Sequence, residues 1–137
     1  MSFLVIMDSP PKIKIAVIVR QYSDQLLLKS YLEELAKCEL LLESRGDTAF
    51  EKLKIFVPRL ILMDVFLEGM GGIQLCRELR SFETFKKTII VGFLRHEKEK
   101  EMGNIPSAGF DYFLVKPLYK IQIRNILKKA FPLDVIF

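Results

Sequence analysis

Two charged side chains stand at the ends of apolar runs, where they could act together. Asp64 closes the run 60–63, and Lys116 closes the run 112–115 and precedes Pro117. In open parallel sheets, binding sites collect beyond the carboxyl ends of the strands. If both runs are strands of one sheet, the carboxylate and the ammonium mark a candidate site at one edge of it.

Apolar runs alternate with amphipathic segments along the chain. The run 13–19 is rich in Ile and Val, which is typical of a strand covered on both faces. The expected strands are 13–19, 38–42, 60–63, 88–94 and 112–115. Helical spacing of apolar residues predicts helices at 23–36 with Ser23 as the cap, at 48–56, after Gly72, in a charged stretch at 95–102, and at 121–131. This alternation predicts an α/β domain with a parallel sheet and right-handed crossovers.

The composition narrows the class of protein. A chain of 137 residues, half of them apolar, is expected to form one domain with a sizeable core. The net charge of +4 permits an acidic partner, but no basic block favours nucleic-acid binding. Cys38 and Cys76 are interpreted as reduced thiols. Because no run is long enough to span a membrane and none has the pattern of a signal peptide, we expect a cytoplasmic protein.

We divide the chain into a domain at 13–131 and two apolar ends, an extension at 1–12 and a tail at 132–137. Exposed apolar segments tend to mark contact surfaces. The two ends either fold back over the sheet or contact another chain, and the sequence leaves both interpretations open.

Two longer stretches around the charged pair carry a family resemblance. Residues 64–72, Asp-Val-Phe-Leu-Glu-Gly-Met-Gly-Gly, resemble the loop that begins with the phospho-accepting aspartate of response regulator receiver domains, although Glu68 stands where a proline is usual. Residues 108–117, Ala-Gly-Phe-Asp-Tyr-Phe-Leu-Val-Lys-Pro, resemble that family's final strand and lysine–proline pair. The resemblance extends from about residue 14 to residue 130. It implies a flavodoxin-like, three-layer α/β/α fold with five parallel strands in the order 2-1-3-4-5.

The site that the resemblance implies is only partly present. In the family, a Mg²⁺ ion lies beside the aspartate and is held in part by two acids after the first strand; Val19 and Arg20 stand at those positions here. Mg²⁺ prefers hard oxygen ligands, which neither side chain supplies. Leu94 stands at the position of the family's phosphoryl-contacting hydroxyl, and Phe113 at its aromatic switch. Pro117 is expected to follow a cis peptide bond.

Asp64 therefore has two interpretations. As a phospho-acceptor, Asp64 would receive the phosphoryl group. Lys116 would then neutralise a phosphoryl oxygen, and Arg20 would take over the electrostatic role of the metal ion. As a structural carboxylate, it would be held by Lys116 and Arg20, because a buried charge needs a partner. We favour the structural role and expect no cofactor; Asp64 and the carbonyl of Phe66 are the ligands that the chain would offer to Mg²⁺.

The favoured hypothesis for function is a stand-alone, degenerate receiver of a two-component phosphorelay. It would be a non-enzymatic interaction module that works without Mg-dependent aspartyl phosphorylation. Its expected partner is another signalling protein, a sensor kinase or a downstream effector, and self-association into a homodimer is left open. The alternative is a functional receiver that a histidine kinase or small phosphodonor phosphorylates on Asp64. A third interpretation, a flavin binder, lacks a phosphate loop after the first strand.

Overall fold

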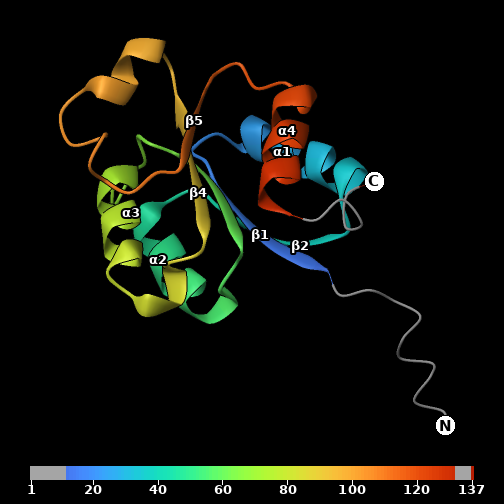
Figure 1. The fold of residues 1–137 in the computed structure, drawn as a ribbon, viewed down its shortest axis with the longest axis horizontal. Helices are drawn as coiled ribbons and strands as arrows, with labels where there is room; N and C mark the ends of the chain where they lie inside the picture. Colours follow the sequence, from blue (N-terminus) through green and yellow to red (C-terminus); the bar gives the residue numbers. More distant parts are fainter. Residues whose placement is uncertain (1–11, 132–136) are drawn as a thin grey trace, which may run out of the picture.

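Five parallel strands form the central sheet of the computed structural model, which describes residues 12–131 and Phe137 (Figure 1). Their order, β2-β1-β3-β4-β5, confirms the predicted topology. The predicted apolar extension and tail lie outside the described residues, apart from Lys12 and Phe137. The strands are β1 (Ile13–Ile18), β2 (Cys38–Glu43), β3 (Leu60–Asp64), β4 (Ile89–Leu94) and β5 (Tyr112–Val115).

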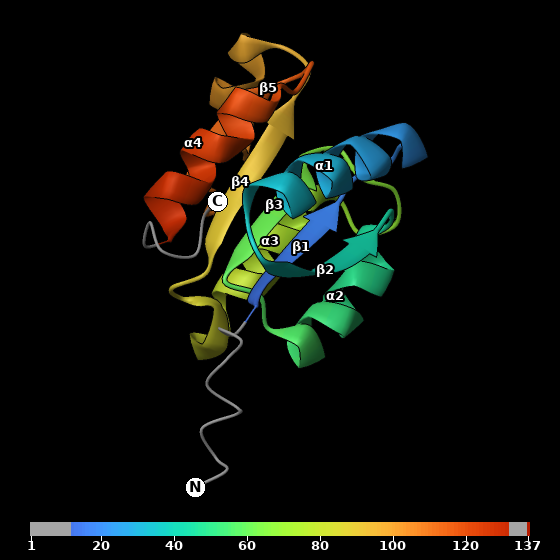
Figure 2. The same cartoon turned by 90° about the vertical axis from the view of Figure 1, so that its right-hand side faces the viewer.

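Helices cover both faces of the sheet and bury two apolar layers (Figure 2). Helices α1 (Tyr22–Leu35) and α4 (Lys120–Ala130) pack on one face, while α2 (Gly46–Phe56) and α3 (Gly72–Arg80) pack on the other. Successive residues of a strand point to opposite faces, so Ile15 and Val17 enter the first layer and Ala16 and Ile18 the second. Within the described residues, no helix has the length and apolar character needed to cross a membrane.

The connection between β4 and β5 is the main departure from the predicted elements. The helix expected at 95–102 is wrong; the chain forms a short 3-10 helix, η3 (Glu97–Glu101). Alternating Glu and Lys residues leave this stretch without an apolar stripe that could pack on the sheet. Glu99 instead accepts hydrogen bonds from the backbone N–H groups of Arg95 (2.7 Å) and His96 (3.0 Å).

The start of α1 also differs from the expectation. Gln21, in an extended conformation, holds the N-cap position and makes no side-chain capping bond. Ser23 lies inside the first turn, so the predicted cap is wrong. The consequence for the candidate site is that Asp24 also falls in this first turn, which follows β1 after a short loop.

The loop after β3 is held by close backbone contacts. The Gly46 N–H donates to the Glu68 carbonyl at 3.1 Å, and a Cβ on Gly46 would lie 1.7 Å from the Met70 carbonyl oxygen. A Cβ on Gly72 would lie 2.4 Å from the carbonyl oxygen of Asp64. Glycine at position 72 therefore lets α3 begin directly against the backbone of Asp64.

Replacing this glycine is expected to destabilise the fold. Gly72→Ala forces the Asp64 backbone or α3 to move, and we expect a loss of about 1–3 kcal/mol of unfolding free energy, as for other overpacked sites. Gly71→Ala is the matched control, because a Cβ there meets nothing within 4 Å; it should cost at most about 1 kcal/mol through its poorer N-cap. Urea unfolding of both variants measures the difference. Equal losses would contradict the close approach at Gly72.

Candidate functional site

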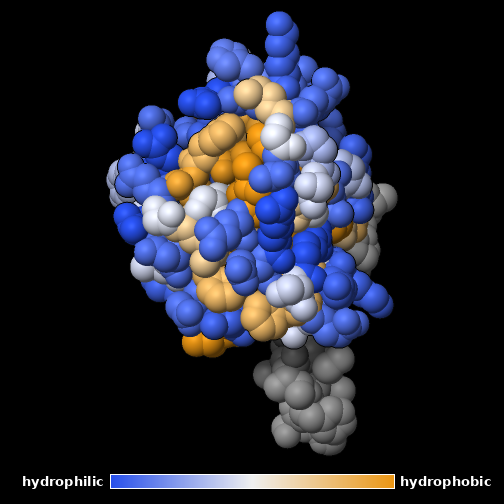
Figure 3. All heavy atoms as spheres, turned by 90° about the vertical axis from the view of Figure 1, so that its left-hand side faces the viewer, coloured by the Kyte–Doolittle hydropathy of each residue, from blue (hydrophilic) through white to orange (hydrophobic). Residues whose placement is uncertain are grey.

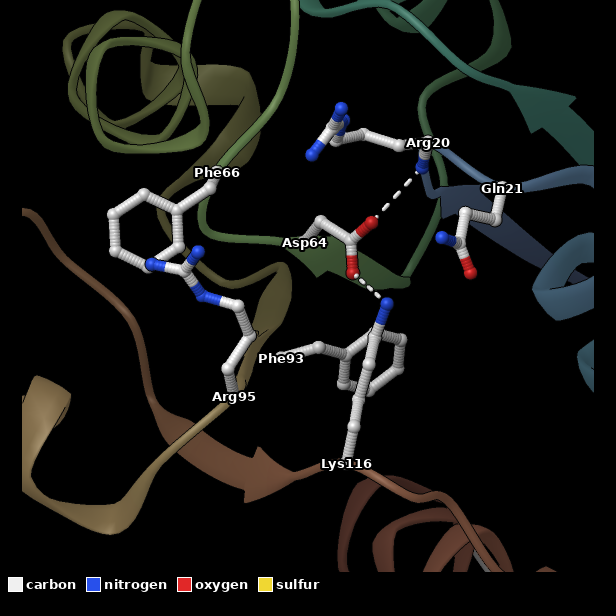
Figure 4. Close-up of a pocket in the computed structure, with 7 residues that line it drawn as sticks. All are labelled: Arg20, Gln21, Asp64, Phe66, Phe93, Arg95 and Lys116. Atoms are coloured by element: carbon white, nitrogen blue, oxygen red, sulfur yellow. Dashed lines mark hydrogen bonds and ion pairs between the residues drawn. The ribbon is translucent and has the colours of Figure 1, made fainter.

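A cavity of about 170 Å³ opens at the carboxyl ends of the strands, where the sequence places Asp64 and Lys116 (Figure 4). The strand ends at β1, β3, β4 and β5 all contribute to it. Its walls combine three cations, one carboxylate and two aromatic rings. The lining residues are Arg20, Gln21, Asp64, Phe66, Phe93, Arg95 and Lys116.

Asp64 is a buried carboxylate whose two oxygens both face N–H donors. Its side chain is only 7% exposed. The backbone N–H of Arg20 donates to Oδ2 at 2.9 Å, and Nζ of Lys116 lies 2.7 Å from Oδ1 (Figure 4). Among the described residues, Oδ1 accepts no hydrogen bond with suitable angles, so the Lys116 contact is an ion pair that leaves some acceptor capacity unused.

Lys116 bridges two carboxylates, and sequence reasoning missed the second. Its Nζ donates to Oδ2 of Asp24 at 2.7 Å, the same distance as to Asp64. The two side chains are about three-quarters buried, at 26% and 22% exposure. An acid in the first helical turn after a strand that leads to the site was the signal that could have found Asp24.

The two carboxylates keep Lys116 charged. Burial alone would lower the pKa of its ammonium, but the two carboxylates, through the Asp24 hydrogen bond and the charges of Asp24 and Asp64, outweigh burial, and the pKa lies above its ordinary value. The contribution of these ion pairs to stability is therefore complete below the ordinary lysine pKa of about 10.4. It is lost as the pH rises through the higher pKa of the folded state.

Arg20 reaches Asp64 through its backbone and turns its side chain away. The guanidinium lies 3.4 Å from the carboxylate of Glu68, and both side chains are more than half exposed, at 51% and 65%. An exposed pair of this kind contributes little stability. The guanidinium that was expected to pair with Asp64 thus pairs with the residue that replaces the family's usual proline.

Arg95 and Phe66 form the opposite wall of the cavity. The Arg95 guanidinium lies over the Phe66 ring, 4.5 Å from its centroid (Figure 4). It also pairs with Glu99 at 2.9 Å. A guanidinium stacked on an aromatic face gains from the ring quadrupole. This stack places a fixed side-chain pair beside the mouth of the cavity.

The two expected switch positions lie behind the cavity instead of lining it. Leu94 is buried with Val65 and Ile105, and the Phe93 side chain faces the cavity in its place. Phe113 packs against the same cluster, with its ring 5.3 Å from that of Phe110. The Lys116–Pro117 peptide bond is cis, which is the conformation that the resemblance implies.

These residues do not fit a Mg²⁺ ion. Val19 has no ligand atom, and position 20 presents a backbone donor to Asp64. The other carboxylate oxygen already faces an ammonium. Among the described residues, no group of three or more His, Cys, Asp or Glu side chains could hold a metal. Mg²⁺ needs near-octahedral oxygen coordination, which the walls of this cavity do not supply.

The role of Asp24 predicts a shift in the titration of Lys116. In Asp24→Asn the ammonium loses one of its two carboxylates, so its pKa should fall toward the ordinary value. Glu34→Gln is the control, because it removes an α1 carboxylate that pairs with a different lysine, Lys120 of α4. The measurement is an NMR titration of the Lys116 side chain. An unchanged Lys116 pKa in Asp24→Asn would contradict the bridged arrangement.

The sequence matches the family model of the response regulator receiver domain over residues 17–128. It is 33% identical to the phosphate regulon transcriptional regulatory protein PhoB of Rhizobium meliloti, over 87% of this chain and 54% of that protein. It is 24% identical to the signal transduction histidine-protein kinase BarA of Escherichia coli K12, over 96% of this chain and 13% of that protein. The chain thus spans about half of the first relative and a small part of the second.

Solved structures share the fold at low sequence identity. CheY4 of Vibrio cholerae has a TM-score of 0.80 at 19% identity, covering 88% of this chain and 100% of that chain. The receiver domain of sensor histidine kinase PA1611 from Pseudomonas aeruginosa, which coordinates a magnesium ion, has 0.78 at 21%, covering 88% and 98%. The Ssk1 receiver domain, solved with Ypd1 of Saccharomyces cerevisiae, has 0.79 at 21%, covering 93% and 94%. With the family match over most of its length, the chain belongs to the response regulator receiver domains of two-component signalling.

Proposed function

We propose that this receiver domain is a protein-interaction module that works without Mg-dependent phosphorylation of Asp64. The observation that carries the proposal is that both Asp64 oxygens face internal groups: Oδ1 forms an ion pair with Nζ of Lys116, and Oδ2 accepts a hydrogen bond from the N–H of Arg20. With Val19 and Arg20 in place of acids, nothing beside Asp64 offers the oxygens that a divalent cation requires. The domain would then signal through its contacts and not through a phosphoryl group.

The charge balance of the cavity supports this proposal. Phosphoryl transfer depends on cations that neutralise the charge of the transferred group. Each cation of the cavity already has a carboxylate partner: Arg20 pairs with Glu68, Arg95 with Glu99, and Lys116 with Asp24 and Asp64. An incoming phosphodonor, itself an anion, therefore meets cations that carboxylates have already neutralised.

A phosphodonor experiment tests the proposal. Incubation with a small phosphodonor, with and without Mg²⁺, is expected to leave the intact mass of the protein unchanged. Asp64→Ala serves as the control for modification at any other position. The double variant Val19→Asp/Arg20→Asp restores the two acids at the end of β1 that the family uses, and it is expected to gain Mg-dependent phosphorylation. A Mg-dependent mass increase in the unmodified protein that disappears in Asp64→Ala would establish the alternative, a functional phospho-accepting receiver.

The apolar face near β5 is the surface through which we propose that a partner binds. Figure 3 shows an apolar patch with a hydrophilic surround on the side that carries α3, η3 and β5. The connection between β4 and β5 contains only η3, so half-buried apolar residues cover the cluster of Val65, Leu94 and Ile105. Met102, nearby in the chain, is 56% exposed. Large exposed apolar patches mark interaction sites.

The charge on α4, which packs on the other side of the edge strand β5, indicates the kind of partner. Helix α4 carries Lys120, Arg124, Lys128 and Lys129 and no acidic residue. Lys129 lies over the Tyr112 ring of β5, 4.8 Å from its centroid. We propose a sensor kinase or downstream effector that presents an apolar side chain flanked by acidic groups. The Ypd1–Ssk1 complex is a precedent for a receiver domain bound to another signalling protein.

The contact face predicts a selective loss of binding. In a pairwise interaction screen against the sensor kinases and effectors of the source organism, Met102→Glu is expected to abolish the interaction because it places a charge beside the apolar face. Ile55→Glu is the matched control, since Ile55 is 86% exposed on α2, away from β5. An interaction that survives Met102→Glu and is lost in Ile55→Glu would place the contact elsewhere.

A further inference from the structure

We propose that the amino edge of the sheet, the edge opposite the candidate site, binds the surface of an anionic lipid bilayer. The inference goes beyond the proposed function and is independent of it, because it uses no residue of the cavity or of the apolar face near β5. Cations stand where the first four strands begin. We call them the amino-edge cations: Lys12, Lys37, Arg59, Lys86 and Lys87.

The parallel sheet gathers these cations along one edge, where the strands begin (Figure 2). Three of them immediately precede β1, β2 and β3, and Lys87 lies two positions before β4. Backbone hydrogen bonds join neighbouring strand starts. The Ile13 N–H donates to the Lys37 carbonyl and the Ile89 N–H to the Arg59 carbonyl, both at 3.0 Å. Cations that are far apart in the sequence therefore form a row.

The amino-edge cations keep their positive charge. Within residues 12–131 and Phe137, none of them forms an ion pair with a carboxylate. Lys37 is half-buried and the others are exposed. Arg59 lies over the Phe131 ring, 5.0 Å from its centroid. An aromatic ring holds a cation in place without cancelling its charge.

The acids of this edge cancel little of that charge. Asp111, which precedes β5, and Glu33 pair with cations outside the set. Glu39 lies beside Lys14 in the register of β1 and β2. Glu83 is the one acid in the segment 81–88 that leads to β4. The amino edge therefore carries unneutralised positive charge, in contrast to the cavity, where each cation has a carboxylate partner.

Exposed apolar side chains lie among these cations. Phe137 is 69% exposed and lines a cavity of about 260 Å³ together with Lys12 and Lys37. Val57 is 37% exposed just before β3, with a φ of 47° that β-branched residues rarely adopt. The apolar sequence 3–7, Phe-Leu-Val-Ile-Met, precedes Lys12 in the chain and lies outside the described residues. The amino edge thus combines positive charge with apolar groups.

This combination favours a bilayer over nucleic acid. Each Lys or Arg near an anionic membrane surface strengthens binding by roughly fivefold, and apolar side chains enter the boundary between headgroups and acyl chains. Nucleic acids stack their bases on aromatic rings, but the Phe131 ring lies under Arg59 and the Phe56 ring under Lys14. An anionic bilayer accepts both the charge and the apolar groups.

Vesicle flotation tests the inference on the full chain. The protein is expected to bind vesicles of phosphatidylcholine mixed with phosphatidylglycerol and not vesicles of phosphatidylcholine alone, and salt should weaken the binding. Lys86→Gln/Lys87→Gln should bind about thirtyfold more weakly, since each cation contributes roughly fivefold. Lys98→Gln/Lys100→Gln is the matched control, because it removes the same charge from η3, beyond the carboxyl end of β4.

A second pair of variants tests the apolar groups. Phe137→Ser is expected to weaken binding to the mixed vesicles, because it removes an apolar side chain that would enter the bilayer. Tyr22→Ser should not weaken it: Tyr22 is 71% exposed, similar to Phe137, but begins α1 beyond the carboxyl end of β1. Thermal unfolding of each variant checks that it remains folded.

Four results would overturn the inference. They are no binding to the mixed vesicles, equal binding to both kinds of vesicle, equal losses in the two lysine double variants, and full binding by Phe137→Ser. A fluorescently labelled DNA duplex completes the comparison. Tight binding to the duplex without binding to vesicles would assign the amino edge to nucleic acid and would also overturn the inference.

Discussion

The buried carboxylate of Asp64 is the constraint on which the rest of the site depends. It ends β3, a strand whose five residues are all buried, and an isolated charge there would be costly. Three other elements supply what it needs: the end of β1 brings the Arg20 N–H, β5 delivers Lys116, and α1 adds Asp24 behind the ammonium. The parallel sheet in the order 2-1-3-4-5 is what gathers these groups at one edge.

The two arginines that line the cavity of this receiver domain each form an ion pair with a glutamate. Arg20 pairs with Glu68, and Arg95 pairs with Glu99 while its guanidinium lies over Phe66. Charged groups therefore meet opposite charges across the cavity, although the two arginine pairs are largely exposed and add little stability. What they change is the local charge: the site offers an anionic phosphodonor little attraction. This balance supports the role in protein contact that we propose for the domain.

The strands and the meeting of Asp64 with Lys116 were predictable from the sequence, because strand-like runs and their charged ends are local patterns. The sheet order followed from the family resemblance. The pairing of Asp24 with Lys116 was missed, because the two residues are 92 positions apart and meet only where α1 packs near the C-terminal part of the chain. The direction of the Arg20 side chain depends on Glu68 in a separate loop. The predicted helix at 95–102 failed because charges at helical spacing do not stabilise a helix without an apolar face to bury. Leu94 was assigned by alignment, but strand alternation turns Phe93 toward the cavity.

The central claim is that an internal ammonium, and not a metal, neutralises the carboxylate at the end of β3. Crystals grown in excess Mn²⁺, with anomalous diffraction recorded at the manganese edge, test it most directly. The account predicts no anomalous peak next to Asp64 and a lysine Nζ within hydrogen-bond distance of the Asp24 and Asp64 carboxylates. A six-coordinate manganese ion bound to Asp64, with Lys116 displaced, would contradict it.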